Sequence, residues 1–242
     1  MMLKILAAFL LLCAACLPAQ AESYRYKIVV LNMPIGEAKV DLDLQPDYNL
    51  KMTTEFGGIV ALFTGAKAEV TAKGKLANDG AHPSENVGQI QWGKKVRRAT
   101  IKFDDKGDVT DLDVKPKYSY PPKERHALDP ATFTDVKDPL SSMIRPVDNG
   151  KLDCTATLRV FDSKERYNLQ LSPTDQPMIC NVQPVSISGY KKIYDEKGSE
   201  PKPLRMTFAP TKNGKYAIPV RIERDMLLGL LLIELIAPEP VK

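Results

Sequence analysis

The sequence predicts an all-β fold: a wrapped antiparallel sheet that forms a barrel or half-barrel and carries one or two short helices. Apolar and polar residues alternate with a period of two along many short segments, which is typical of half-buried strands. Clusters of Gly, Pro, Asn and Asp separate these segments. About a dozen strands in one chain favour a sheet that closes or wraps on itself, because that hides its edges.

The first half of the chain begins with a predicted hairpin. Residues 24–30 and 38–44 each alternate, and Pro34 and Gly36 lie between them. Further strands are expected over 48–56, 66–76, 88–92 and 95–103, and the last of them enters a turn at 104–108. The apolar run 59–63 predicts either a short helical plug at one end of the barrel or a bent strand.

The middle of the chain changes character. Pro121 and Pro122 prevent regular strand pairing. Asp138 is a suitable N-cap and Pro139 fits a first helical turn, so the one clear helix is expected to continue to residue 144. Residues 118–150 are either a boundary between two halves or a crossover within one β domain, and we expect a single domain over 22–242.

The second half returns to strands, expected over 155–161, 166–171, 180–190, 204–208 and 216–222. The apolar run 226–236 contains a glycine and a glutamate and is too short to span a membrane. It is interpreted as a core strand, the alternative being two buried segments around a bend.

Residues 1–21 have the pattern of a secretory signal peptide. A short basic start is followed by the apolar run 5–17 and then by Ala19-Gln20-Ala21. Cleavage after Ala21 would send residues 22–242 to the periplasm or outside the cell, with no transmembrane span. The alternative, cleavage before Cys16 with lipid anchoring at that residue, fits less well because Cys13 stands where an aliphatic residue is usual.

The cysteines divide into two pairs. Cys13 and Cys16 lie within the signal peptide, which leaves Cys154 and Cys180 in the mature chain. A single remaining pair in an oxidising compartment predicts a structural disulfide.

Composition and motifs argue against several function classes. The net charge of +4 is spread along the chain, so nucleic acid is not an expected partner. The basic stretch 94–98 is either a site for an anionic surface or a solvated strand face. His82 and His126 are the two histidines and lack zinc-ligand spacing. No nucleophile elbow, phosphate loop or dinucleotide motif occurs, so we expect no enzyme activity, catalytic residue, metal or cofactor.

A β-barrel or half-barrel of this length can hold a lipid or other apolar ligand. Six residues are candidates to line such a site, each also compatible with an ordinary packed core: Met52, Phe56, Leu62, Phe63, Trp92 and Phe103. The leading hypothesis is a non-enzymatic protein that binds this ligand in support of cell-envelope integrity. The alternatives are a scaffolding module that binds envelope proteins or peptidoglycan, and a carboxylate-dependent hydrolase.

Ordered motifs add a family resemblance. They are the segments 33–38, 138–143, 154–167, 180–190 and 217–220, followed by Leu228-Gly229. Together they resemble domain of unknown function 3108, an uncharacterised proteobacterial envelope family. The resemblance implies an exported β-rich protein with a wrapped or half-barrel sheet. It supplies no catalytic residues to carry over.

Overall fold

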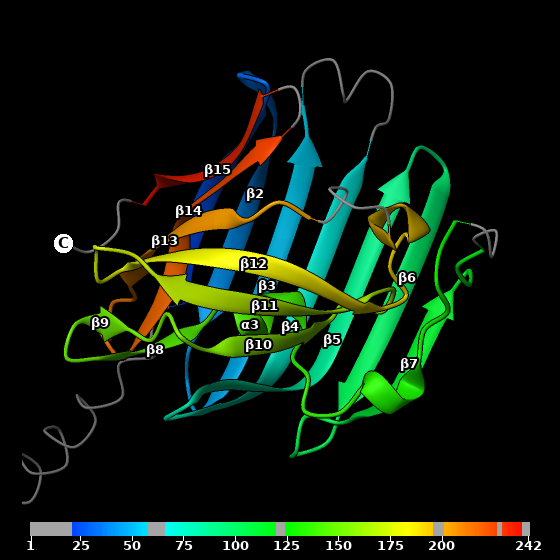
Figure 1. Cartoon of the computed structure of the whole chain (residues 1–242), viewed down its shortest axis with the longest axis horizontal. Helices are drawn as coiled ribbons and strands as arrows, with labels where there is room; N and C mark the ends of the chain where they lie inside the picture. The colour runs from blue at the N-terminus through cyan, green and yellow to red at the C-terminus, as the bar shows by residue number, and fades with distance from the viewer. Residues whose placement is uncertain (1–20, 58–65, 120–123, 196–200, 227–228, 239–242) are drawn as a thin grey trace, which may run out of the picture.

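The computed structural model describes residues 21–57, 66–119, 124–195, 201–226 and 229–238. Most of them belong to one antiparallel sheet, in which thirteen strands follow the order β10-β11-β12-β13-β14-β15-β1-β2-β3-β4-β5-β6-β7. The strands of the first half are β1 (Glu22–Val30), β2 (Met33–Asp43), β3 (Asp47–Phe56), β4 (Lys67–Ala77), β5 (Gly80–Trp92), β6 (Lys95–Phe103) and β7 (Val109–Lys115). The prediction of an all-β fold is confirmed (Figure 1).

The second half continues the same sheet. Its strands are β8 (Arg145–Asp148), β9 (Lys151–Leu152), β10 (Thr157–Phe161), β11 (Arg166–Pro173), β12 (Ile179–Ser188), β13 (Leu204–Pro210), β14 (Tyr216–Met226) and β15 (Gly229–Ala237). The short β8 pairs with β14 and β9. The two halves join where β15 pairs with β1, with Leu235 opposite Tyr26.

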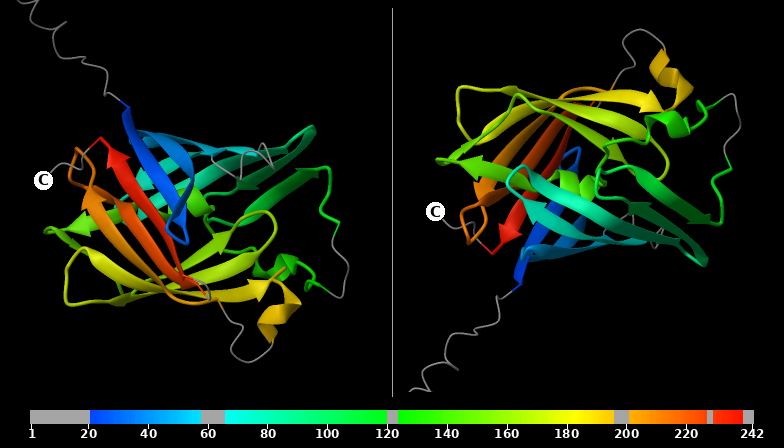
Figure 2. Two further views of the ribbon diagram at one scale, coloured as in Figure 1. Left: turned by 90° about the horizontal axis from the view of Figure 1, so that it is seen from above. Right: turned by 90° about the horizontal axis from the view of Figure 1, so that it is seen from below.

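The sheet wraps strongly without closing. Figure 2 shows β10–β13 facing the strands of the first half across an interior that contains the short helix α3 (Pro139–Ser142). Two further single turns, η2 (Pro130–Thr132) and η3 (Lys192–Asp195), lie in the connections. Within the described part of the chain, no helix has the length and apolar character needed to cross a membrane.

The open edges β7 and β10 are bridged by the chain around residue 137. On one side, Lys137 N donates to Arg159 O and Phe161 N donates to Lys137 O, both at 2.9 Å. On the other side, Val136 N donates to Gly107 O at 2.9 Å. Gly107 permits this approach, because its φ is 82° and a Cβ there would lie 3.1 Å from the Val136 carbonyl oxygen. Backbone hydrogen bonds from residues 136 and 137 thus connect the two sides of the half-barrel where β7 and β10 do not pair.

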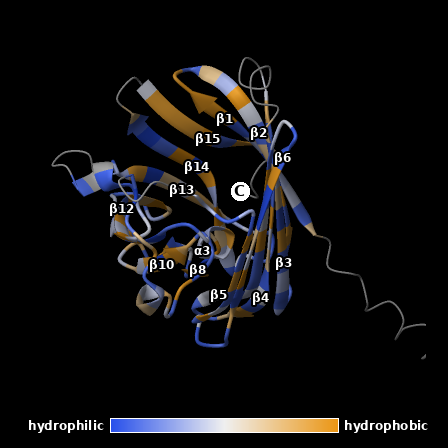
Figure 3. Cartoon of the chain, turned by 90° about the vertical axis from the view of Figure 1, so that its right-hand side faces the viewer, coloured by the Kyte–Doolittle hydropathy of each residue, from blue (hydrophilic) through white to orange (hydrophobic). Residues whose placement is uncertain are grey.

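Inward-facing side chains form three buried clusters. One lies between β1–β5 and the Ile144 and Ile218 side chains. A second lies between β10–β14 and includes Cys154 and Cys180, which are at disulfide distance with Cα atoms 5.4 Å apart. A third, smaller cluster lies where the sheet is bridged. Figure 3 shows the hydrophobic stretches along β1 and β15, where the halves join.

Two local predictions need correction, and two others fall outside the described residues. The helix capped by Asp138 is shorter than expected, because residues from 145 onward leave it to form β8. The run 226–236 is divided, since Met226 ends β14 and pairs with Gly229 at the start of β15. The apolar run 59–63 and the signal peptide up to residue 20 lie outside the described residues.

Candidate apolar ligand-binding site

Two adjoining cavities occupy the interior of the half-barrel. The outer cavity has a volume of about 460 Å³ and the inner cavity about 270 Å³. Both are lined by Met52 from β3 and Leu140 from α3, so they meet at these two side chains. Their volumes are in the order of the roughly 300–1,000 Å³ typical of small-molecule sites.

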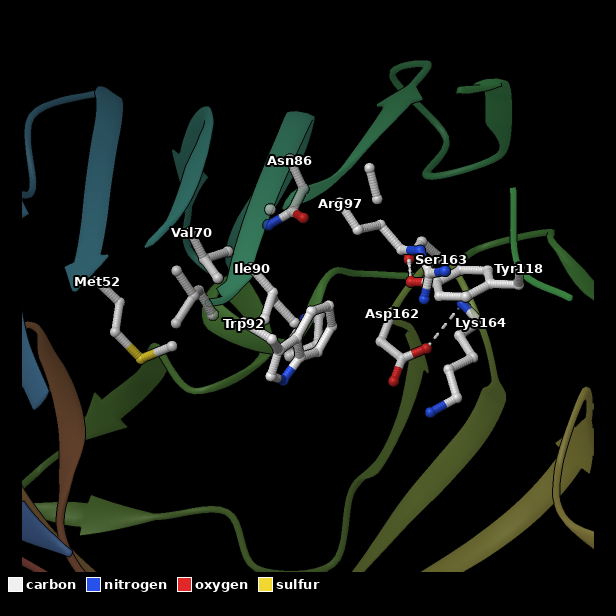
Figure 4. A pocket seen from close by; sticks show the side chains of 14 residues that line it. Met52, Val70, Asn86, Ile90, Trp92, Arg97, Tyr118, Asp162, Ser163 and Lys164 are labelled. Carbon is white, nitrogen blue, oxygen red and sulfur yellow. Dashed lines mark hydrogen bonds between the residues drawn. The ribbon is translucent and has the colours of Figure 1, made fainter. Parts of the chain in front are cut away.

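The outer cavity lies in front of a row of strand residues whose side chains are small on β5 and β6. Met52, Val70, Gly88 and Ala99 are successive register partners on β3, β4, β5 and β6, and all four line the cavity. Figure 4 shows Met52 and Val70 at its wall. A Cβ built on Gly88 has no heavy atom within 4 Å. The sheet therefore keeps its regular backbone pairing here while the space in front of it stays empty.

The inner cavity is almost wholly apolar. Its walls are side chains from β1–β3 on one side and from β14, β15 and the α3 region on the other. Of its described lining residues, Thr54 and Tyr26 alone bear hydroxyl groups. The Tyr26 hydroxyl donates to Pro219 O at 2.9 Å, and burial raises the pKa of this phenol above its usual range. Its polar atom is therefore occupied by the protein, leaving an apolar surface for a ligand.

The outer cavity has a polar mouth at the opposite end. The Arg97 guanidinium lies over the Tyr118 ring, 4.7 Å from its centroid, and Nε donates to Pro116 O at 3.1 Å. Lys164 and Asp162 line the same cavity. Figure 4 shows Arg97, Tyr118, Asp162 and Lys164 grouped together on one side of it. Tyr118 and Lys164 also line a further surface pocket beside residues 125–128.

A buried polar network anchors α3 inside the sheet. The Asp138 carboxylate is fully buried and accepts from Asn86 Nδ2 at 3.1 Å, Leu140 N at 2.9 Å, Ser141 N at 3.1 Å and Ser141 Oγ. Burial raises the pKa of this carboxyl above its ordinary value, while the hydrogen bonds act in the opposite direction. With the carboxylate ionised, Ser141 Oγ donates to it, and the Tyr48 hydroxyl, 2.6 Å away, donates to Ser141 Oγ. The network thereby places Pro139 and Leu140 at the cavity wall.

The six sequence-selected lining residues have different locations. Met52 lines both cavities, and Trp92 lines the outer cavity with 42% of its surface exposed. Phe56, at the end of β3, has the same strand parity as Met52. Phe103 packs instead in the small cluster at the bridged edge and lines neither cavity. Leu62 and Phe63 lie outside the described residues.

Sequence reasoning did not select Gly88 or Leu140, and it considered Arg97 only as part of the basic stretch 94–98. Arg97 could have been found by strand parity, because it alternates inward with Ala99 and Ile101 on β6. The importance of Gly88 depends on which residues oppose it, and no local pattern carries that information.

The two histidines form surface hydrogen bonds with carboxylates. His82 Nε2 is 2.8 Å from Asp79 Oδ1, and His126 Nε2 is 2.7 Å from Asp195 Oδ2. Across the residues that the structure describes, no group of three or more His, Cys, Asp or Glu side chains is arranged to hold a metal ion.

The fold and cavities define a wrapped β half-barrel with a hollow apolar interior and a polar mouth. The family model for a protein of unknown function (DUF3108) matches residues 23–235, and the chain belongs to that family. No curated protein matches the chain. No solved structure matches it either.

Proposed function

We propose that this protein is a non-enzymatic periplasmic protein that binds a lipid or other apolar ligand inside the half-barrel, in support of the cell envelope. The observation that carries the proposal is the pair of adjoining cavities, which share Met52 and Leu140 as walls. Apolar space inside the half-barrel favours an apolar occupant, because its transfer from water is favourable by about 25 cal/mol per Å² buried.

The proposed location rests on the sequence and is compatible with the disulfide-distance pair. The signal-like segment 1–21 supports export. Cys154 and Cys180 lie together in the buried core of the second half, as expected for a protein that folds in an oxidising compartment. Anchoring through Cys16 is the alternative form of the same proposal, and N-terminal sequencing of the mature protein distinguishes the two.

Trp92 provides a direct assay, because it is the single tryptophan of the chain and lines the outer cavity. Protein refolded from denaturant to remove copurified lipid should change its tryptophan emission when titrated with a soluble alkyl compound. Mass spectrometry of organic extracts from natively purified protein should recover a bound amphiphile at a fixed ratio.

A cavity-filling variant makes the test specific to the interior. Gly88→Leu places a side chain in open space next to Ala99 and should reduce ligand affinity at least tenfold while preserving the fold. Gln89→Leu is the matched control, because residue 89 is exposed on the other face of the same strand. Equal binding by Gly88→Leu, Gln89→Leu and wild type would refute binding in the cavity, as would reproducibly ligand-free native protein that never responds to the titration.

A further inference from the structure

We propose that the ligand is an anionic single-chain amphiphile, whose head group pairs with Arg97 at the mouth while its chain enters the two cavities. This inference rests on the proposed function and adds the chemistry of the ligand's polar end. The shared chemistry is a carboxylate or phosphate attached to one acyl or alkyl chain.

The charge of Arg97 is not neutralised by a carboxylate. Within the part of the chain that the structure describes, no Asp or Glu oxygen lies within 4.0 Å of its guanidinium. The side chain is nevertheless only partly exposed and lies at the polar mouth of a cavity whose other walls include apolar side chains. A cation in that position is well suited to an anion that arrives with an apolar chain.

The orientation of Arg97 is fixed before any ligand binds. The Tyr118 ring supports one face of the guanidinium and Pro116 O holds Nε, so the terminal nitrogens remain to address an anion. A planar guanidinium presents a rigid fork that matches carboxylate and phosphate oxygens. Since stacking already restricts the side chain, little further conformational entropy is lost when the anion binds.

The surrounding charges favour an anion as well. Lys164 lines the same cavity and adds a second positive charge. In the Asp162 carboxylate, the acidic group among the lining residues, Oδ1 accepts from Lys164 N at 2.9 Å and from Glu165 N at 2.7 Å, so these turn amides partly offset its negative charge. Arg97 is also the inward member of the basic stretch 94–98, whose other residues are exposed.

The distance from mouth to inner cavity suits one chain. One row of register partners crosses the sheet from β6 to β1, and its members are Arg97, Ile90, Ala68, Thr54, Ala38 and Tyr26. Thr54 lines the inner cavity, and the three inter-strand spacings from Arg97 to Thr54 give roughly 14 Å along the sheet. One acyl chain spans about 15 Å, half of a bilayer's hydrocarbon core. A head group at Arg97 therefore allows the chain to pass Met52 and end in the inner cavity.

The test compares three ligands that share one chain: dodecanoate, dodecyl phosphate and 1-dodecanol, each below its micelle or solubility limit and followed by Trp92 emission. Wild type should bind the anionic ligands about tenfold or more tightly than the alcohol, the effect of one charge-assisted contact. Arg97→Gln should lose most of that preference. Arg97→Lys, which keeps the charge without the planar fork, should be intermediate.

Arg98→Gln is the matched control, because this substitution removes the same charge from the exposed face of the same strand. It should leave all three affinities unchanged. Tighter binding of dodecanoate than of dodecyl phosphate would point to free fatty acids, and the reverse order to lipid phosphates. Circular dichroism and melting temperature confirm that each variant is folded before its affinities are compared.

The possible failures are distinguishable. If dodecanol binds wild type as tightly as the anions, or if Arg97→Gln retains the anion preference, the head-group inference is overturned while binding in the cavity stands. If none of the three ligands binds wild type, both the inference and the proposed function are overturned.

Discussion

Replacing Asp138 should test whether the buried network holds α3 inside the half-barrel. Asp138→Ala removes the N-cap of α3 and the acceptor for Asn86 Nδ2 and Ser141 Oγ. Loss of an N-cap costs about 1 kcal/mol. Each of the two buried donors left without a partner costs about 1–3 kcal/mol, so the total loss should be roughly 3–7 kcal/mol. That is a large share of the about 5–15 kcal/mol that stabilises a typical domain.

Asp138→Asn should destabilise the protein less than Asp138→Ala, and it should isolate the contribution of the carboxylate's charge. The amide keeps an acceptor for Leu140 N and Ser141 N, and its Nδ2 can donate to Ser141 Oγ. Asn86 Nδ2 then shares the single acceptor oxygen with these backbone donors. We expect a loss of about 1–2 kcal/mol at neutral pH.

The pH dependence of this variant follows from the raised pKa of Asp138. The folded protein holds the carboxyl proton more tightly than the unfolded chain does. The contribution of this group to stability is therefore fully present below its ordinary pKa near 3.8 and is lost as the pH rises through the raised folded value. The difference in the free energy of unfolding between wild type and Asp138→Asn should therefore become smaller as the pH rises.

Urea denaturation at a series of pH values, from below 3.8 to neutral, measures this difference in the free energy of unfolding directly. Asp129→Ala is the matched control, since Asp129 caps the exposed turn η2 by accepting from Ala131 N at 3.0 Å. Its replacement should cost no more than about 1 kcal/mol. A loss below 1 kcal/mol for Asp138→Ala, or a gap between wild type and Asp138→Asn that widens as the pH rises, would refute the role given to this network.

Two further predictions concern the cross-link and the outer face. Cys154→Ser should lower the free energy of unfolding by about 3.5 kcal/mol for the 26-residue separation and release one thiol at Cys180; unchanged urea stability together with two free thiols in native wild type would contradict it. Glu234→Gln should cost at most about 1 kcal/mol at pH 7, because Glu234 pairs with Lys27 at 2.7 Å and with Arg221. The Lys27 hydrogen bond is the largest cause that lowers the pKa of Glu234, so this loss should vanish as the pH falls through that lowered value, and a difference that persists in acid would count against it.

Strands with clean alternation could be located from sequence alone. Residues 24–30 and 95–103 alternate because one face meets the interior and the other meets solvent. The start of β5 was missed because Pro83 and Asn86 break that pattern. Asn86 faces inward since its amide bonds the Asp138 carboxylate, a partner 52 residues away. When the hydrogen-bond partner of a buried polar residue is far away in the sequence, the neighbouring residues do not indicate that the polar residue faces inward.

The same limit explains the helix and the site. The cap at Asp138 is a local signal and was identified, but the helix ends early because Arg145 pairs with Ala217 on β14. Met52 and Trp92 could be selected as large apolar side chains on strands. The empty space beside them depends on Gly88 meeting Val70 and Ala99, which is a property of register across three strands.

The hollow interior follows from the size of the sheet. About eight strands make a barrel that side chains just fill, whereas thirteen are wrapped here around one interior. The inserted α3 takes up part of the difference and contacts the sheet through Asp138 and Asn86. What α3 does not fill remains as the two cavities on either side of Leu140. The polar network and the apolar cavities are therefore two consequences of placing one short helix inside an oversized sheet, and Gly88→Leu should fill space that the fold itself does not need.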